Sequence, residues 1–201
     1  YVHVATGNYN SSTARFYTDL GLFTSRPDFG EDASALFNLL TGYSRAEGHE
    51  WSKLIIAPKF LADRIITLID RERRHAEAGL PARIIAKMNA LVDPGAIEAL
   101  YQASRSGVQI DLIVRGICCL RPGLPGVSEN IRVISIVDKF LEHSRISYFQ
   151  NGDSPEVYLA SADWMPRNFR RRVEVMFPIE DARLKSRIVD GILGVALADN
   201  V

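Results

Sequence analysis

An alternation of short apolar strands and amphipathic helices between residues 53 and 114 most constrains what this chain can fold into. The pattern predicts strands at residues 54–57, 83–89 and 109–114, and helices at residues 61–78 and 95–106. Strands and helices in this order imply right-handed crossovers and a largely parallel sheet. The predicted fold class is therefore α/β, with helices flanking a mixed, largely parallel sheet.

The rest of the chain adds shorter elements. We expect strands at residues 1–6, 131–137 and 171–177, a hairpin of strands 146–149 and 157–160, and helices at 31–40 and 181–198. The segment 42–52 is polar and contains glycine, which is typical of a domain boundary. We therefore expect one domain to end near residue 45 and a second to occupy residues 50–201.

Three polar residues follow the predicted parallel strands. Lys87 and Asn89 lie at the carboxyl end of one strand, and Arg115 lies at the end of the next. Because ligands of such sheets bind beyond the carboxyl ends of the strands, these residues are candidates for phosphate binding. The alternative is that each one is a solvated strand end.

The predicted hairpin carries polar residues at its ends. Since one residue separates His143 from Arg145, an extended backbone directs both side chains to the same side. The partner strand leads into Ser161, Asp163 and Asn168, and we expect Asp163 to orient the imidazole ring. An acid–base group, a fixed cation and neutral donors in one place suit a phosphoryl group. The alternative is a histidine that merely caps a hairpin.

Composition excludes some classes of protein. Lysine and arginine number 24 against 24 acidic residues, so the basic excess of a bulk nucleic-acid binder is absent. Nineteen of the basic residues are arginine, which fits polyanion recognition, although a GC-rich genome gives the same bias. No apolar run reaches the roughly 18 residues of a transmembrane helix. The adjacent pair Cys118 and Cys119 favours a reduced, cytoplasmic protein, with membrane association left open.

The pattern of His143 and Arg145, followed by Ser161, Asp163 and Asn168, resembles one half of the phospholipase D superfamily motif, with arginine in place of lysine. Three longer stretches resemble the C-terminal region of bacterial polyphosphate kinase, namely residues 6–10, 112–123 and 161–168. The resemblance runs over essentially the whole chain. It implies that residues 1–45 are the tail of one phospholipase-D-like domain and that residues 50–201 are a second.

The resemblance also implies a function. The family reversibly transfers the γ-phosphate of ATP to polyphosphate through a phosphohistidine, which splits one transfer into two. We expect the acceptor histidine to lie before Tyr1, so the 201 residues alone should be inactive. His143 would then serve the leaving side, and Tyr17 would belong to the nucleotide pocket. The predicted ATP or phosphate ligands are these two residues together with Asn8, Lys87, Asn89, Arg115, Arg145, Ser161 and Asp163.

The resemblance also implies the cofactor and the partners. Mg²⁺ would arrive with ATP, without ligands from this chain. The partners would be ATP or ADP, polyphosphate and further copies of the full-length enzyme, without nucleic acid. Two other functions stay open: a phosphodiesterase or phosphatase with His143 as the covalent nucleophile, and a non-catalytic module for polyanion binding or oligomer assembly.

Overall fold

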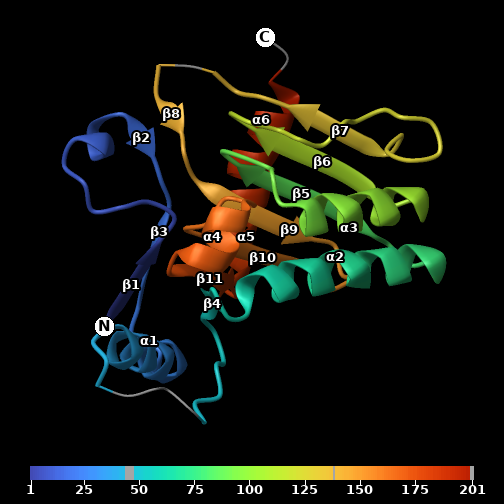
Figure 1. Ribbon diagram of the computed structural model, residues 1–201. Helices are drawn as coiled ribbons and strands as arrows, with labels where there is room; N and C mark the ends of the chain where they lie inside the picture. Colours follow the sequence, from blue (N-terminus) through green and yellow to red (C-terminus); the bar gives the residue numbers. More distant parts are fainter. Residues whose placement is uncertain (44–47, 138, 200–201) are drawn as a thin grey trace.

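The computed structural model describes residues 1–43, 48–137 and 139–199, and its centre is a seven-stranded sheet in the order β4-β11-β10-β9-β5-β6-β7 (Figure 1). The strands are β4 (Ile55–Ala57), β5 (Arg83–Met88), β6 (Gln109–Val114), β7 (Ile131–Ile134), β9 (Arg145–Phe149), β10 (Glu156–Ala160) and β11 (Glu174–Ile179). Each one overlaps a segment that the sequence predicts as a strand. Part of the expected domain boundary, residues 44–47, lies outside the described residues.

The expectation of a largely parallel sheet is wrong for most neighbouring strands. β5, β6 and β7 pair in parallel, but the successive pairs from β4 through β11, β10 and β9 to β5 are antiparallel. The β9–β10 hairpin and β11 lie between β4 and β5, and strands joined by a tight turn must be antiparallel. As a result the carboxyl ends of β5, β6 and β10 and the amino end of β9 meet at one edge of the sheet.

Helices cover both faces of this sheet. On one face Ile65, Leu68 and Leu100 belong to a buried cluster with alternate residues of β5 and β6. On the other face Phe29 and Ile188 belong to a second cluster. The helices are α1 (Pro27–Leu40), α2 (Leu61–Glu77), α3 (Pro94–Arg105), α4 (Pro166–Arg171), α5 (Ala182–Ile188), a π-helical stretch (Val189–Gly194) and α6 (Val195–Ala198). The sequence pattern does not predict α4, and it places the start of α1 four residues too late. In both helices the first residue is a proline, which lies before the first residues with helical apolar spacing.

The N-terminal segment forms two small strand pairs, one within itself and one with the rest of the chain. β1 (Val2–Ala5) pairs antiparallel with β3 (Gly21–Thr24), and β2 (Tyr17–Thr18) pairs in parallel with β8 (Leu141–Glu142). A 3-10 turn (Thr13–Arg15) precedes β2. The β2–β8 pair brings residues near 18 beside residues near 142, as the blue and orange ribbons show in Figure 1.

One buried carboxylate ties α2 to the β9–β10 turn, and its removal should destabilise the protein. Glu72 is fully buried and accepts hydrogen bonds from the backbone N–H groups of Asn151 (2.9 Å) and Arg83 (3.3 Å). Glu72→Ala removes the acceptor of both N–H groups and leaves a cavity in place of a fully buried side chain. The free energy of unfolding, measured with urea, should fall by about 2–4 kcal/mol. Glu31→Ala, at an exposed position of α1, should change it by less than about 0.5 kcal/mol.

The same carboxylate predicts a pH effect on stability. Burial raises the pKa of Glu72, against the two backbone N–H donors, which lower it. Because the folded state then favours the protonated carboxyl, the free energy of unfolding should fall as pH rises above the ordinary pKa of about 4.3. The alanine variant should lack this part of the slope. An identical pH dependence in both proteins would contradict the assignment.

Candidate functional site

His143 lies in the two-residue gap between β8 and β9, at the edge of the sheet where several strand ends meet. Its backbone N–H and that of Ser144 both donate to the carbonyl oxygen of Thr18, at 3.2 and 3.0 Å. The His143 side chain is buried, with 8% of the residue exposed. The N-terminal segment thus fixes this histidine from one side.

The carboxylate beside His143 comes from Asp19, and the expectation that Asp163 orients the ring is wrong. Nδ1 of His143 lies 3.0 and 2.9 Å from Oδ1 and Oδ2 of Asp19. Burial would raise the pKa of Asp19, but hydrogen bonds from His143 and Thr6 outweigh it and lower the pKa below its ordinary value. An ionised carboxylate here favours the tautomer with a proton on Nδ1. Nε2 is then free to accept or donate a proton, and it has no hydrogen-bond partner among the described residues.

Asp163 instead binds Arg145. The guanidinium makes a two-point contact, with Nε 3.2 Å from Oδ1 and Nη2 3.0 Å from Oδ2. Nη1 donates to the carbonyl oxygen of Thr6 and lies 3.1 Å from Nδ1 of His143. Burial would raise the pKa of Asp163, but Arg145 outweighs it and lowers the pKa. The predicted proximity of His143 and Arg145 is therefore confirmed, while a phosphate contact by Arg145 stays a prediction.

Two further predicted residues lie on the N-terminal side of His143. The ring of Tyr17 packs against the imidazole with centroids 4.5 Å apart and planes tilted by 42°. Tyr17, Asp19 and the exposed Asn8 all line a cavity of about 300 Å³. The structure therefore places Tyr17 against His143, and it places Asn8 in the cavity that Tyr17 and Asp19 line.

Arg115 and Asn89 form the opposite side of the site. Arg115 is exposed, and its Nε donates to Oδ1 of Asn89 at 2.9 Å. Its two terminal nitrogens have no hydrogen-bond partner in the described part of the chain. Asn89 is buried, and its Nδ2 lies 3.3 Å from both the carbonyl oxygen of His143 and Oδ1 of Asp163. The amide of Asn89 is thus occupied within the protein, which does not support a role as a direct phosphate ligand.

Lys87 does not face the site either. Its residue is 2% exposed, and Nζ donates to the carbonyl oxygens of Glu142 (3.1 Å) and Ser144 (3.2 Å) and to Oγ of Ser144 (3.1 Å). Burial lowers the pKa of Lys87, with Glu142 opposing it. An ammonium has three donors, and here internal acceptors use all of them. These contacts do not support the prediction that Lys87 binds phosphate.

The side chains of Ser161 and Asn168 contact Glu174 and not the acidic residues near His143. The Ser161 hydroxyl and Nδ2 of Asn168 both donate to the buried carboxylate of Glu174. Oγ of Ser161 also accepts from the backbone N–H of Val175 at 3.1 Å. The expected convergence of Ser161 and Asn168 on His143 is wrong. Sequence reasoning missed Glu174 because it lies inside a strand without a motif around it.

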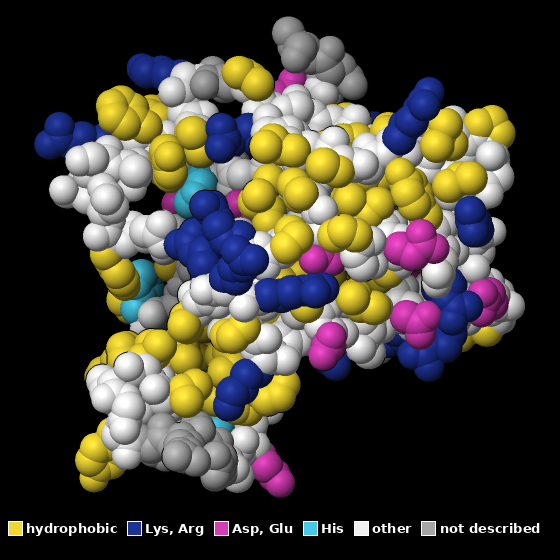
Figure 2. Space-filling model, in the orientation of Figure 1, with side chains coloured by type: hydrophobic (Ala, Val, Ile, Leu, Met, Phe, Trp, Pro, Cys, Tyr) yellow, Lys and Arg dark blue, Asp and Glu magenta, His cyan; other side chains and the backbone are white. Residues whose placement is uncertain are grey.

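Arginines accumulate on the surface beside this edge of the sheet. Figure 2 shows Lys and Arg side chains gathered over α4. The exposed residues Arg167, Arg170, Arg171 and Arg172, which we call the α4 arginine group, lie in or directly after this helix. Arg172 is 3.3 Å from Glu174, and Arg170 is 3.9 Å from Asp93.

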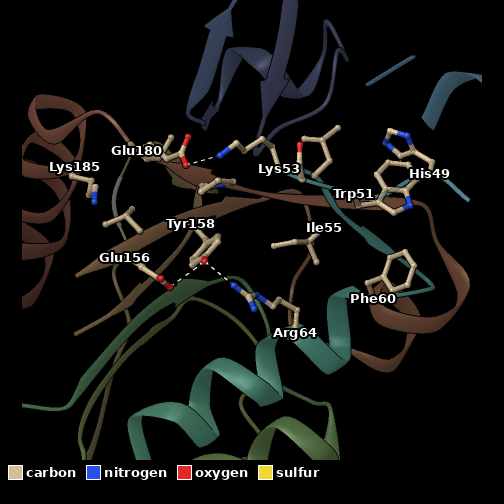
Figure 3. A pocket seen from close by; sticks show the side chains of 15 residues that line it. His49, Trp51, Lys53, Ile55, Phe60, Arg64, Glu156, Tyr158, Glu180 and Lys185 are labelled. Atoms are coloured by element: carbon tan, nitrogen blue, oxygen red, sulfur yellow. Dashed lines mark hydrogen bonds and ion pairs between the residues drawn. The ribbon is translucent and has the colours of Figure 1, made fainter. Parts of the chain in front are cut away.

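A larger cavity of about 890 Å³ lies at the other end of the strands (Figure 3). Glu156 at the start of β10 and Ile179 at the end of β11 line it, together with Trp51, Phe60 and Arg64. Figure 3 shows Arg64 and Glu156 directed at the hydroxyl of Tyr158, with which both interact. None of the residues predicted for the site lines this cavity.

Comparison with known proteins agrees with this arrangement. Residues 54–201 match the family model described as polyphosphate kinase C-terminal domain 2, and residues 1–46 match polyphosphate kinase C-terminal domain 1. The chain belongs to the polyphosphate kinase family. The polyphosphate kinase of Synechocystis sp. is 58% identical over 100% of this chain, and polyphosphate kinase 1 of Chlorobaculum tepidum is 55% identical over 100% of it. The chain spans 27% and 28% of the length of these two relatives.

Solved structures support the fold of this polyphosphate kinase chain. The crystal structure of polyphosphate kinase from Porphyromonas gingivalis matches 99% of the chain at a TM-score of 0.92 and 44% identity, and this chain covers 30% of it. NucT from Helicobacter pylori matches 70% of the chain at a TM-score of 0.50 and 14% identity, a likeness of fold alone. The predicted α/β fold, with helices on both faces of a mixed sheet, is confirmed. No helix of the described residues is long and apolar enough to cross a membrane.

Proposed function

We propose that this chain forms the ATP side of a polyphosphate kinase, which reversibly transfers the γ-phosphate of ATP to polyphosphate through a phosphohistidine. The observation that carries the proposal is the pair of His143 and Asp19, flanked by the ring of Tyr17 and by two arginines, in a member of this family. The acceptor histidine is proposed to lie outside these 201 residues.

The roles follow from the contacts. Asp19 holds the Nδ1 proton of His143, so Nε2 is the atom that would stabilise or protonate the oxygen that leaves as the γ-phosphate departs. Tyr17 would stack on the base, and the side chain of Asn8 would donate to the nucleotide. Arg145, already paired with Asp163, contributes a fixed positive field near the ring.

Arg115 is the residue most available to bind phosphate. Nε is anchored by Asn89, which leaves the two terminal nitrogens as donors in a fixed plane. We propose that they contact the phosphate oxygens of ATP. The α4 arginine group then lies where a polyphosphate chain would leave the site.

The residues present do not fit a dedicated magnesium site. Asp19 is bound to His143 and Thr6, and Asp163 to Arg145 and Asn89. No group of three His, Cys, Asp or Glu residues suited to a metal ion occurs in the described part of the chain. We propose that the Mg²⁺ of the family is held by the phosphates of ATP, and no step above depends on it.

An assay of the full-length protein tests the function. With ATP it should form polyphosphate, and with polyphosphate and ADP it should form ATP. Release of inorganic phosphate or cleavage of a phosphodiester, without polyphosphate, would instead support the phosphodiesterase or phosphatase. Binding of polyphosphate without either reaction would support the non-catalytic module. Self-association and a cytoplasmic location are further proposals, which light scattering and cell fractionation test.

Substitution of Arg115 should lower activity. In the full-length enzyme, Arg115→Ala should reduce the rate of polyphosphate synthesis by about tenfold or more, because a hydrogen bond to a charged group is worth about 1.5–3 kcal/mol. Arg115→Lys should restore little if the contact uses both terminal nitrogens. Arg105→Ala, at an exposed position in the last turn of α3, is a matched control and should have no effect. Unchanged rates in both directions would exclude Arg115 from the site.

A further inference from the structure

The N–H groups of His143 and Ser144 bind the backbone of Thr18, whereas the carbonyl groups of this segment are held by side chains. Three successive carbonyl groups, those of Glu142, His143 and Ser144, accept hydrogen bonds from only two side chains. Nζ of Lys87 binds the first and third at 3.1 and 3.2 Å, and Nδ2 of Asn89 binds the second at 3.3 Å. Lys87 lies in β5 and Asn89 directly after it, two positions apart, so both side chains face the same side.

Lys87 is chemically unusual at this place. A buried ammonium needs acceptors for all three donors, and the segment 142–144 supplies every one that it uses. The carboxylate of Glu142, 3.4 Å from Nζ, balances its charge. The side chain therefore depends on this one segment, and the segment depends on it.

Asn89 connects the histidine to the other functional side chain. Oδ1 accepts from Nε of Arg115, Nδ2 donates to the carbonyl oxygen of His143, and the backbone N–H donates to Asp163 at 2.7 Å. One amide thus contacts both Arg115 and the backbone of His143. Its orientation is fixed, because a flipped amide would present its nitrogen to the Arg115 guanidinium.

We propose that Lys87 and Asn89 are positioning residues that set the location of His143 relative to Arg115. The inference rests on the function proposed above, in which His143 and Arg115 act on the same phosphate group. β5 lies inside the sheet between β9 and β6, so it offers a rigid support. Neither residue touches the substrate, and each acts through the group that it holds.

Kinetics of the full-length enzyme test this role. Lys87→Met removes the donors and keeps much of the volume, and it should lower kcat about 10- to 100-fold, because a small displacement of a reacting group has an effect of this size. KM for ATP should change less than about threefold, since Tyr17 and Arg115 remain. Lys87→Gln keeps two N–H donors and should retain more activity than Lys87→Met. Lys59→Met, at an exposed position, is the matched control and should match the wild type.

A double-mutant cycle separates positioning from general damage. In the His143→Ala background, Lys87→Met should lower kcat by less than about twofold, because the group that Lys87 positions is gone. An equal loss of kcat in both backgrounds, or no loss in the wild-type background, would overturn the inference. Should Lys87→Met fail to fold, the same cycle is run with Lys87→Gln.

Hydrogen exchange gives a readout that does not depend on the reaction. In full-length Lys87→Met, and likewise in Asn89→Ala, peptides that cover residues 141–145 should exchange about tenfold faster or more, while peptides from β10 should be unchanged. Unchanged exchange at residues 141–145 would overturn the inference. If the wild-type enzyme made no polyphosphate, the proposed function would be overturned. The exchange data would still decide whether Lys87 and Asn89 position His143.

Discussion

Replacing His143 with alanine in the full-length enzyme should lower the rate of phosphate transfer from ATP about 10²- to 10⁴-fold, while ATP still binds. This is the range that general acid–base help supplies. Nε2 of His143 is the free atom of a ring whose other nitrogen is held by Asp19. A rapid-quench measurement of phosphohistidine formation, with ATP affinity from calorimetry, checks both halves of the statement.

A second substitution distinguishes two versions of this role. His143→Gln keeps a hydrogen-bond donor but cannot transfer a proton. Near-normal turnover of the glutamine variant would leave a purely electrostatic role. Near-normal turnover of the alanine variant would return His143 to a structural one. His75→Ala, on α2 and without contact to the site, is the matched control and should retain full activity.

Asp19→Asn should also lower the rate of phosphate transfer. The amide can donate to Nδ1 of His143, which would place the ring proton on Nε2 and reverse the tautomer that the carboxylate favours. Loss of an orienting carboxylate in this way lowers rates by about 10²-fold or more in enzymes that depend on it. Turnover of the full-length variant should fall accordingly, with KM for ATP nearly unchanged. Asp63→Asn, exposed in the first turn of α2, should behave as wild type.

The lowered pKa of Asp19 gives this prediction a pH test. Because its folded-state pKa is depressed, the stability contributed by the Asp19–His143 contact is present above the ordinary aspartate pKa of about 3.9 and is lost as pH falls below it. The free energy of unfolding of wild type and Asp19→Asn should therefore differ near pH 6 and converge toward pH 3. A constant difference across this range would exclude ionisation of Asp19 as the cause.

Much of the fold follows from local patterns in the sequence. The helices α2 and α3 and the strands β5 and β6 agree with prediction to within one residue at each end, because apolar spacing, Pro94 and Gly107 mark them. The β9–β10 hairpin follows from its turn in the same way. The relative direction of neighbouring strands does not follow from local patterns. No feature of the β4 sequence indicates that three later strands lie between β4 and β5.

The site was predictable only in part for the same reason. His143 and Arg145 are two residues apart, and their contact follows from strand geometry. Asp19 is 124 residues from His143, and two strands of only two residues each, too short to show a periodic pattern, bring them together. Asp163 was predicted in place of Asp19 because it is an acidic residue that directly follows the partner strand of the hairpin. The position of Lys87 near the end of β5 was predicted correctly, but its burial was not, since a position in a strand does not determine which way the donors of its side chain point.

Because the β2–β8 pair brings Asp19 to His143, we expect the site around His143 to form late in folding. An intermediate in which only residues 53–199 are folded would contain all seven strands and the helices of one face, although the other face also packs against Phe29 of α1. His143 in such an intermediate has no carboxylate at Nδ1, and Arg145 has no Thr6 carbonyl to bind. Contacts that close a loop of more than a hundred residues form slowly, because the entropy of closure comes before any gain. A newly made chain should therefore gain its secondary structure first and its oriented histidine afterwards.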